Sequence, residues 1–135
     1  MSRRLLIWRT RARLNGERGF TILETVIALM VVFGSMTALA YTDTSDYTGA
    51  DTSAELSAIE PSLTYNAAGV ASTGPTVVSV AVTGSNAIWS AAALSQSGTC
   101  YWIMDDAGAG GTGTKYGTGA ACTGTAAAAA AGATW

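Results

Sequence analysis

The longest apolar segment of the chain runs from Phe20 to Tyr41 and carries a single charge, the carboxylate of Glu24. As a helix, the stretch from Phe20 to Leu39 would be roughly 30 Å long, which matches the hydrocarbon core of a bilayer. A helix that is apolar on all sides must be buried in lipid or among other helices. A carboxylate inside lipid is costly unless it finds a partner, so we interpret Glu24 as a functional residue.

The charged side chains are divided between the two ends of the chain. Six arginines precede Phe20, and Lys115 is the one basic side chain that follows it. Eight of the nine acids lie after Phe20, so a cut before this residue would leave one base against eight acids, a net charge of −7. This balance disfavours nucleic acid as a partner, because such binding depends on lysine and arginine at phosphates. The basic start is typical of the cytoplasmic side of a membrane.

The residues at the start of the apolar segment form a recognisable motif. Arg18 and Gly19 are followed by Phe20, Thr21 and, three residues later, Glu24. This arrangement resembles the class III leader of type IV pilins, in which a basic leader ends in glycine before Phe-Thr-x-x-Glu and an apolar helix. The resemblance implies cleavage between Gly19 and Phe20 by a prepilin peptidase, and N-methylation of the new Phe20 amine. It also implies subunit assembly through Phe20 and Glu24.

The resemblance divides the chain into three parts. Residues 1–19 would be the cleaved leader, residues 20–41 the transmembrane and filament-core helix, and residues 42–135 a small solvent-facing head. The protein would then be a structural subunit, held in the cytoplasmic (inner) membrane until an assembly platform adds it to a homopolymer of its own copies. The product would be an extracellular pilus on a bacterial surface. Glu24 would pair with the Phe20 amine of a neighbouring subunit, cancelling two buried charges.

The sequence departs from the usual pilin pattern in two places. Related pilins often carry a proline near the end of the apolar helix, whereas this chain has none before Pro61. Gly34 and Ser35 are therefore the candidate for an unwound patch, with close packing against another helix as the alternative. After Tyr41 the composition changes at once to threonine, aspartate and glycine. The polar half of the first helix is accordingly expected to be shortened.

Two other interpretations of the N-terminal part stay open. Ala38, Leu39 and Ala40 form an A-x-A pattern at the end of the apolar run, so a conventional signal peptidase could cut after Ala40 and release a small secreted binding domain. Alternatively, the chain is a minor pilin or a type II secretion pseudopilin. The phrase from Glu24 to Phe33 resembles minor pilins, which carry the same leader.

The head is predicted to combine one short helix with a small antiparallel sheet, an α+β fold. Thr52 is a favourable N-cap and Glu55 completes a capping box, so we expect a helix over Ser53–Ile59 that ends before Pro61. The six alanines of residues 126–131 favour helix but are too few for one that is stable alone, so they should pack on the head or fray.

A β-branched, partly alternating run predicts a strand at residues 76–83, and the segments 87–94 and 99–104 are interpreted as a second and a third strand. Turn residues separate them, and Lys115 with Tyr116 is expected to add a short edge strand. The result would be a meander of three or four strands. Asp105 and Asp106 are interpreted as a turn that closes the third strand, followed by a glycine-rich loop up to residue 113.

Cys100 and Cys122 lie in the predicted exported part, where an even count favours one disulfide over a metal site. Such a bond would contribute about 3–4 kcal/mol in the chain-entropy model. The phrase Ser97–Trp102, a second cysteine some twenty residues later and the terminal Trp135 resemble the heads of small pilins, actinobacterial ones in particular.

The sequence offers no recognisable catalytic motif. The chain has no histidine, and we find no nucleophile–base pair, phosphate loop or metal cluster, so we expect no enzyme, no metal and no cofactor. We interpret the head's aromatic residues as core and subunit contacts rather than an adhesive or electron-carrying surface. They are Trp89, Tyr101, Trp102, Tyr116 and Trp135.

Overall fold

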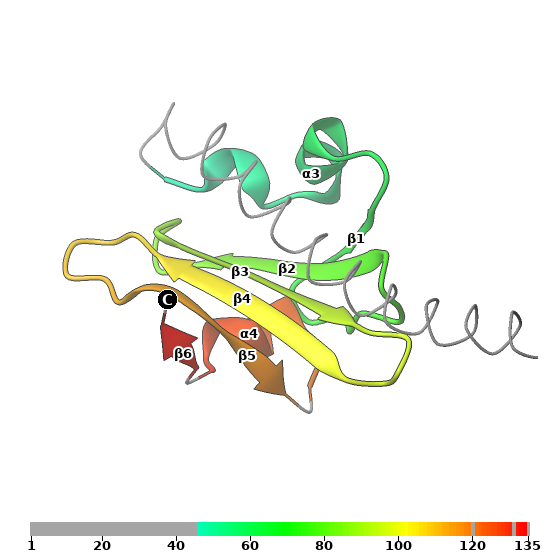
Figure 1. The fold of residues 1–135 in the computed structure, drawn as a ribbon. Coiled ribbons are helices and arrows are strands. Elements are labelled where there is room, and N and C mark those ends of the chain that lie inside the picture. Colours follow the sequence, from blue (N-terminus) through cyan, green and yellow to red (C-terminus); the bar gives the residue numbers. More distant parts are fainter. Residues whose placement is uncertain (1–45, 120, 131, 135) are drawn as a thin grey trace, which may run out of the picture.

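The computed structural model describes residues 46–119, 121–130 and 132–134. In this part of the chain six strands form one sheet in the order β1-β2-β3-β4-β5-β6 (Figure 1). The strand β1 is parallel to β2, and every later neighbour is antiparallel. The strands are β1 (Thr64–Asn66), β2 (Val77–Thr83), β3 (Ile88–Leu94), β4 (Cys100–Asp106), β5 (Gly113–Gly119) and β6 (Ala133–Thr134).

The predicted meander is confirmed in β2, β3 and β4, and the sheet extends beyond it on both sides. The short edge strand predicted at Lys115 and Tyr116 is instead the seven-residue strand β5, which pairs with β4 along its whole length and with β6 on its other side. Its glycines argue against a strand locally. Gly117 is nevertheless required, because a Cβ there would lie 2.8 Å from the Trp102 ring. Tertiary packing therefore overrides local propensity.

The helix α3 (Ser53–Ile59) has the predicted bounds. The Glu55 amide donates to Thr52 Oγ1 at 3.3 Å, and the Thr52 amide donates to Glu55 Oε2 at 3.1 Å. These bonds form the predicted capping box. The Thr52 hydroxyl also donates to Glu55 Oε2 at 2.9 Å, and this bond, followed by the one from the Thr52 amide, lowers the pKa of the Glu55 carboxyl. The helix ends at Ile59, two residues before Pro61, as the sequence indicates.

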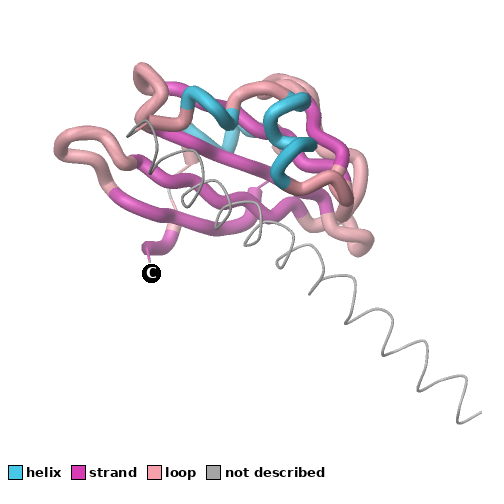
Figure 2. Tube along the Cα trace, turned by 90° about the horizontal axis from the view of Figure 1, so that it is seen from above, coloured by secondary structure: helices cyan, strands magenta, loops and turns pink. Residues whose placement is uncertain are grey.

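One face of the sheet is covered by α3 and the short 3-10 helix η2 (Thr48–Ala50). Seen from above, these short helices lie across the strands (Figure 2). Residues from the segment before β2 pack against alternate residues of β2, β3 and β4 and form the larger of two hydrophobic cores. Its buried members are Tyr47, Ala50, Leu56, Leu63, Tyr65, Val78, Val80, Trp89, Ala91, Ala93 and Ile103.

The opposite face is covered by α4 (Gly124–Ala128), which lies on the other side of the sheet from α3 (Figure 1). The alanine run is therefore packed on the head, although the helix begins earlier and ends earlier than residues 126–131. Small side chains line this face of β2 and β3. The Gly124 amide donates to Ser79 Oγ at 2.9 Å, and Ser90 Oγ donates to the Gly124 carbonyl at 2.9 Å. The helix thus begins directly against the strand backbone.

The prediction that Asp105 and Asp106 form a turn is only partly correct. Both are the last residues of β4, and Asp105 pairs with Trp89 on one side and Thr114 on the other. The following loop does depend on Asp106, whose carboxylate accepts from the amides of Gly108 at 3.3 Å and Thr112 at 3.1 Å. The strand continues through both acids because β3 and β5 provide ladder partners for them.

Replacing Gly124 with alanine is expected to destabilise the contact between α4 and the sheet. An added Cβ would lie 2.5 Å from the Ala81 nitrogen and 2.5 Å from the Val80 carbonyl carbon. Overpacking of this kind costs about 1–3 kcal/mol, so the urea midpoint of the full chain should fall. Gly49→Ala is the control: its Cβ would have no atom within 4 Å, and its φ is −86°. Equal midpoints for the two variants would contradict the close contact.

Candidate functional site at the two ends of strand β4

The residues predicted to carry processing and assembly lie outside the described part of the chain. They are Gly19, Phe20, Glu24, Gly34 and Ser35. Their roles stay predictions, as does the apolar helix of residues 20–41. Among the described residues, no helix is long and apolar enough to cross a membrane. Of the predicted site residues, the cysteine pair lies within the described part of the chain.

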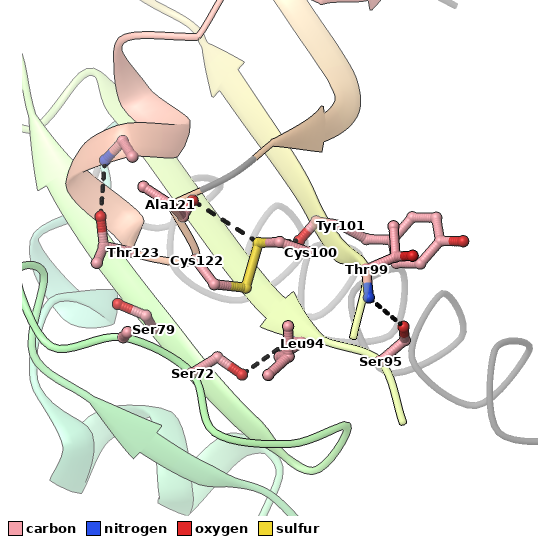
Figure 3. The surroundings of a disulfide bond; sticks show 12 residues. Ser72, Ser79, Leu94, Ser95, Thr99, Cys100, Tyr101, Ala121, Cys122 and Thr123 are labelled. Atoms are coloured by element: carbon pink, nitrogen blue, oxygen red, sulfur yellow. Dashed lines mark hydrogen bonds between the residues drawn. A yellow bond between two sulfur atoms is a disulfide. The ribbon is translucent and has the colours of Figure 1, made fainter. Parts of the chain in front are cut away.

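Cys100 and Cys122 form a disulfide, as predicted (Figure 3). Their Cα atoms lie 5.4 Å apart, and both residues are buried, with exposed fractions of 3% and 6%. Cys100 is the first residue of β4, and Cys122 lies two residues before α4. The bond therefore fastens the C-terminal segment to the start of β4.

Hydrogen bonds around the disulfide attach a third segment, the connection between β1 and β2. The Ser72 amide donates to the Cys122 carbonyl at 2.8 Å, and Ser72 Oγ accepts from the Leu94 amide at 2.8 Å (Figure 3). Both the amide and the hydroxyl of Thr125 donate to the Ala68 carbonyl at 2.9 Å. The disulfide thus lies where the ends of β3 and β4, the β1–β2 connection and α4 meet.

The other end of β4 carries a polar contact that the sequence analysis missed. The Tyr47 hydroxyl donates to Asp105 Oδ2 at 2.5 Å, and Thr114 Oγ1 donates to Asp105 Oδ1 at 2.7 Å. Tyr47 is fully buried. It is separated from Asp105 by 58 residues in the sequence, so no local sequence pattern predicts the pair. The contact attaches the first described residues to the end of β4.

Other titratable groups lie on the α3 side of the sheet. Burial, and then the Glu60 carboxylate, raise the pKa of Tyr65 to about 12. The Tyr65 hydroxyl donates to the Glu60 carbonyl at 3.1 Å. A side-chain hydrogen bond with Glu55 raises the pKa of the Asp51 carboxyl. Within the described residues, no three histidine, cysteine, aspartate or glutamate side chains gather as a metal site.

The aromatic residues of the head divide between the core and the surface. Trp89 and Trp102 are buried in the two separate cores, on opposite faces of the sheet. Tyr101 is half-buried against the first core, and Tyr116 is 38% exposed. Core packing is therefore confirmed for the two tryptophans, while Trp135 lies outside the described residues.

A scan against protein-family models, a search of curated proteins and a search of solved structures each found no match to this chain. The arrangement at β4 joins chain segments through a covalent bond at one end and charge-assisted hydrogen bonds at the other. Any functional assignment of the chain accordingly depends on its own residues.

Removing the disulfide should destabilise the head strongly. The bond spans 22 residues, a loop for which the chain-entropy model gives about 3 kcal/mol. The double variant Cys100→Ser with Cys122→Ser should therefore unfold at lower urea than the oxidised wild-type chain. A phosphine reductant should lower the wild-type midpoint toward that of the variant and leave the variant unchanged. Peptide mapping without reductant should recover the two cysteine peptides linked, and finding them as free thiols would contradict the bond.

Proposed function

We propose that the chain is the precursor of a type IV pilus subunit, cleaved after Gly19 and polymerised through residues 20–41. The observation that carries the proposal is the sequence from Arg18 to Glu24 joined to the apolar run that ends at Tyr41. An ordinary signal peptide needs no carboxylate in the first turn of its apolar segment, whereas a pilin uses one in assembly. The α+β head with its disulfide is compatible with this role.

Assembly would depend on replacing lipid by protein around the apolar helix. Leaving the bilayer is tolerable when neighbouring subunits bury the same apolar surface. Glu24 and the Phe20 amine would then be buried together, because a buried charge is tolerated only with a partner of opposite sign. Each added subunit would repeat this pair, so the ionic contact would also fix the axial position of one helix against the next.

The head would be the solvent-facing part of the subunit. Its described residues contain six acidic side chains and one basic side chain, Lys115. Asp51 is exposed and Glu55 is partly exposed, both on the α3 side of the sheet. Such a surface favours solubility and disfavours binding to nucleic acid. Under this proposal, the partners are other copies of the chain, the prepilin peptidase, the assembly platform and, before assembly, the inner membrane.

The proposal predicts the first residue of the mature protein. Intact-mass measurement of the chain from membranes or from shed filaments should give a protein that begins at Phe20 and carries an N-methyl group. Gly19→Leu should block this maturation, because the peptidase would no longer meet a glycine before the cut. A mature chain that begins at Tyr41 would contradict the proposal and favour the secreted binding domain released after Ala40.

A minor pilin or type II secretion pseudopilin is the second candidate, favoured by the Glu24–Phe33 phrase. The same leader would be cut at the same bond, so the N-terminal residue does not distinguish it from a major subunit. The share of this chain in purified filaments does distinguish a minor from a major subunit. A major subunit makes up most of the filament mass, whereas a minor one is present at a small fraction.

Substitution of Glu24 separates membrane insertion from assembly. Glu24→Gln removes the charge and keeps the shape, whereas Glu24→Val makes the helix uniformly apolar. Both variants should insert and be cleaved normally, because neither adds a charge to the bilayer core. In both, however, the Phe20 amine would be buried without its anion, at about 3–5 kcal/mol for each added subunit. Filament yield should therefore fall to background.

The measurement compares processed subunit in membranes with filaments shed from the same cells. Wild-type cells and the Gly19→Leu strain provide the two limits, full assembly and no processing. If Glu24 served insertion alone, the Glu24→Val strain would yield as many filaments as wild type. That result would remove Glu24 from the assembly mechanism.

A further inference from the structure

The first described residues are attached to the sheet more firmly than a connecting segment requires. Tyr47 and Ala50 are fully buried in the larger core. The Tyr47 amide donates to the Asn86 carbonyl at 2.8 Å, and its hydroxyl donates to Asp105 Oδ2 at 2.5 Å. The Ala50 amide donates back to the Tyr47 carbonyl at 3.0 Å. Tyr47 is thus held at both its backbone and its side chain.

The Asn86 end of this attachment lies in an unusual turn. Gly84, Ser85 and Asn86, which connect β2 and β3, have φ values of 61°, 56° and 68°. Two consecutive residues with a Cβ in this region are unfavourable, and such a turn persists only where its surroundings hold it. Asn86 provides that support, since its side-chain amide donates to Thr48 Oγ1 at 3.4 Å while its carbonyl accepts from Tyr47. The turn and the 46–50 segment therefore depend on each other.

The contact of Tyr47 with Asp105 and the contacts of Asn86 with residues 46–50 lie at the same end of the sheet. The turn 84–86 is separated by one residue from Ile88, which pairs with Asp106, and the next pair in the register is Trp89 with Asp105. The disulfide lies at the opposite end of β4, where Cys100 pairs with Leu94. The N-terminal and C-terminal segments are thus fastened to opposite ends of the same strand.

We propose that residues 46–50, the turn 84–86 and Asp105 form a clamp that couples the chain before residue 46 to the sheet. The Tyr47 hydroxyl is its positioning group, because a phenylalanine ring at this position would fill the core equally well without the bond to Asp105. A displacement of residues 46–50 is transmitted through the clamp to the ends of β3 and β4. Opening the clamp is the first step by which the segment covering this face separates from the sheet. The clamp does not require polymerisation. If the proposed function holds, it is where the filament core is joined to the head.

Hydrogen exchange on the full chain in detergent tests the clamp without filaments. The amides of Tyr47 and Ala50 report its opening. Tyr47→Phe removes a hydrogen bond to a charged group and so destabilises the closed clamp. Hydrogen exchange of both amides should therefore become about 10- to 100-fold faster. Asp105→Asn should do the same, and the double variant should exchange no faster than the more affected single one. Amides in the middle of β3 and β4 should keep their wild-type rates.

Thr114→Val is the matched control, because it removes the other hydroxyl that donates to Asp105 without touching Tyr47. Its Tyr47 and Ala50 amides should exchange within about threefold of wild type, since the bond between Tyr47 and Asp105 remains. Unchanged exchange in Tyr47→Phe would overturn the proposal. An equal acceleration across residues 46–50, β3 and β4 would also overturn it, because the hydroxyl would then support the whole fold rather than a local clamp.

Discussion

Strand β4 is the element to which both ends of the described chain are fastened. It pairs with β3 and β5 at every one of its positions, so it cannot shift its register without breaking two ladders. The disulfide at Cys100 attaches the segment that covers one face, and Asp105 attaches the segment that covers the other. Because the two attachments lie at opposite ends of the strand, both covering segments have their positions along the sheet fixed by β4.

The two faces of the sheet are closed by different physical means. The α3 face uses large side chains such as Trp89, Tyr47 and Leu56, whose burial removes much apolar area from water. On the α4 face the large side chains Trp102 and Met104 come from β4, whereas β2 and β3 present small ones, so the helix can approach the backbone of those two strands. An alanine helix of this length contributes little apolar area and is marginal alone. The hydrogen bonds of Ser79 and Ser90 to Gly124, together with the nearby disulfide, hold it in place.

The features that could be predicted from sequence are those set by neighbouring residues. The capping box of Thr52 and Glu55 located the start of α3 and Pro61 its end, while a β-branched run located β2 and the turn residues after it separated β3 and β4. The disulfide followed from there being only two cysteines. The full length of β5 could not be predicted, because the glycine at position 117 is explained only by the ring of Trp102 on the neighbouring strand. The contact between Tyr47 and Asp105 joins residues too far apart in sequence for any local signal.

In the proposed filament, the charge of the heads constrains where cohesion can arise. Each described head carries six acids and one base, and this excess is repeated at every subunit. Like charges within a Debye length of about 8–10 Å repel at moderate salt, so head–head contacts gain little from electrostatics. The attraction must then come mainly from the apolar segment of residues 20–41, where Glu24 and a neighbour's Phe20 amine would be the only opposite charges in a nonpolar core. A small head suffices for such a filament, provided that it is firmly joined to that segment, which is the role the clamp at Tyr47 would fill.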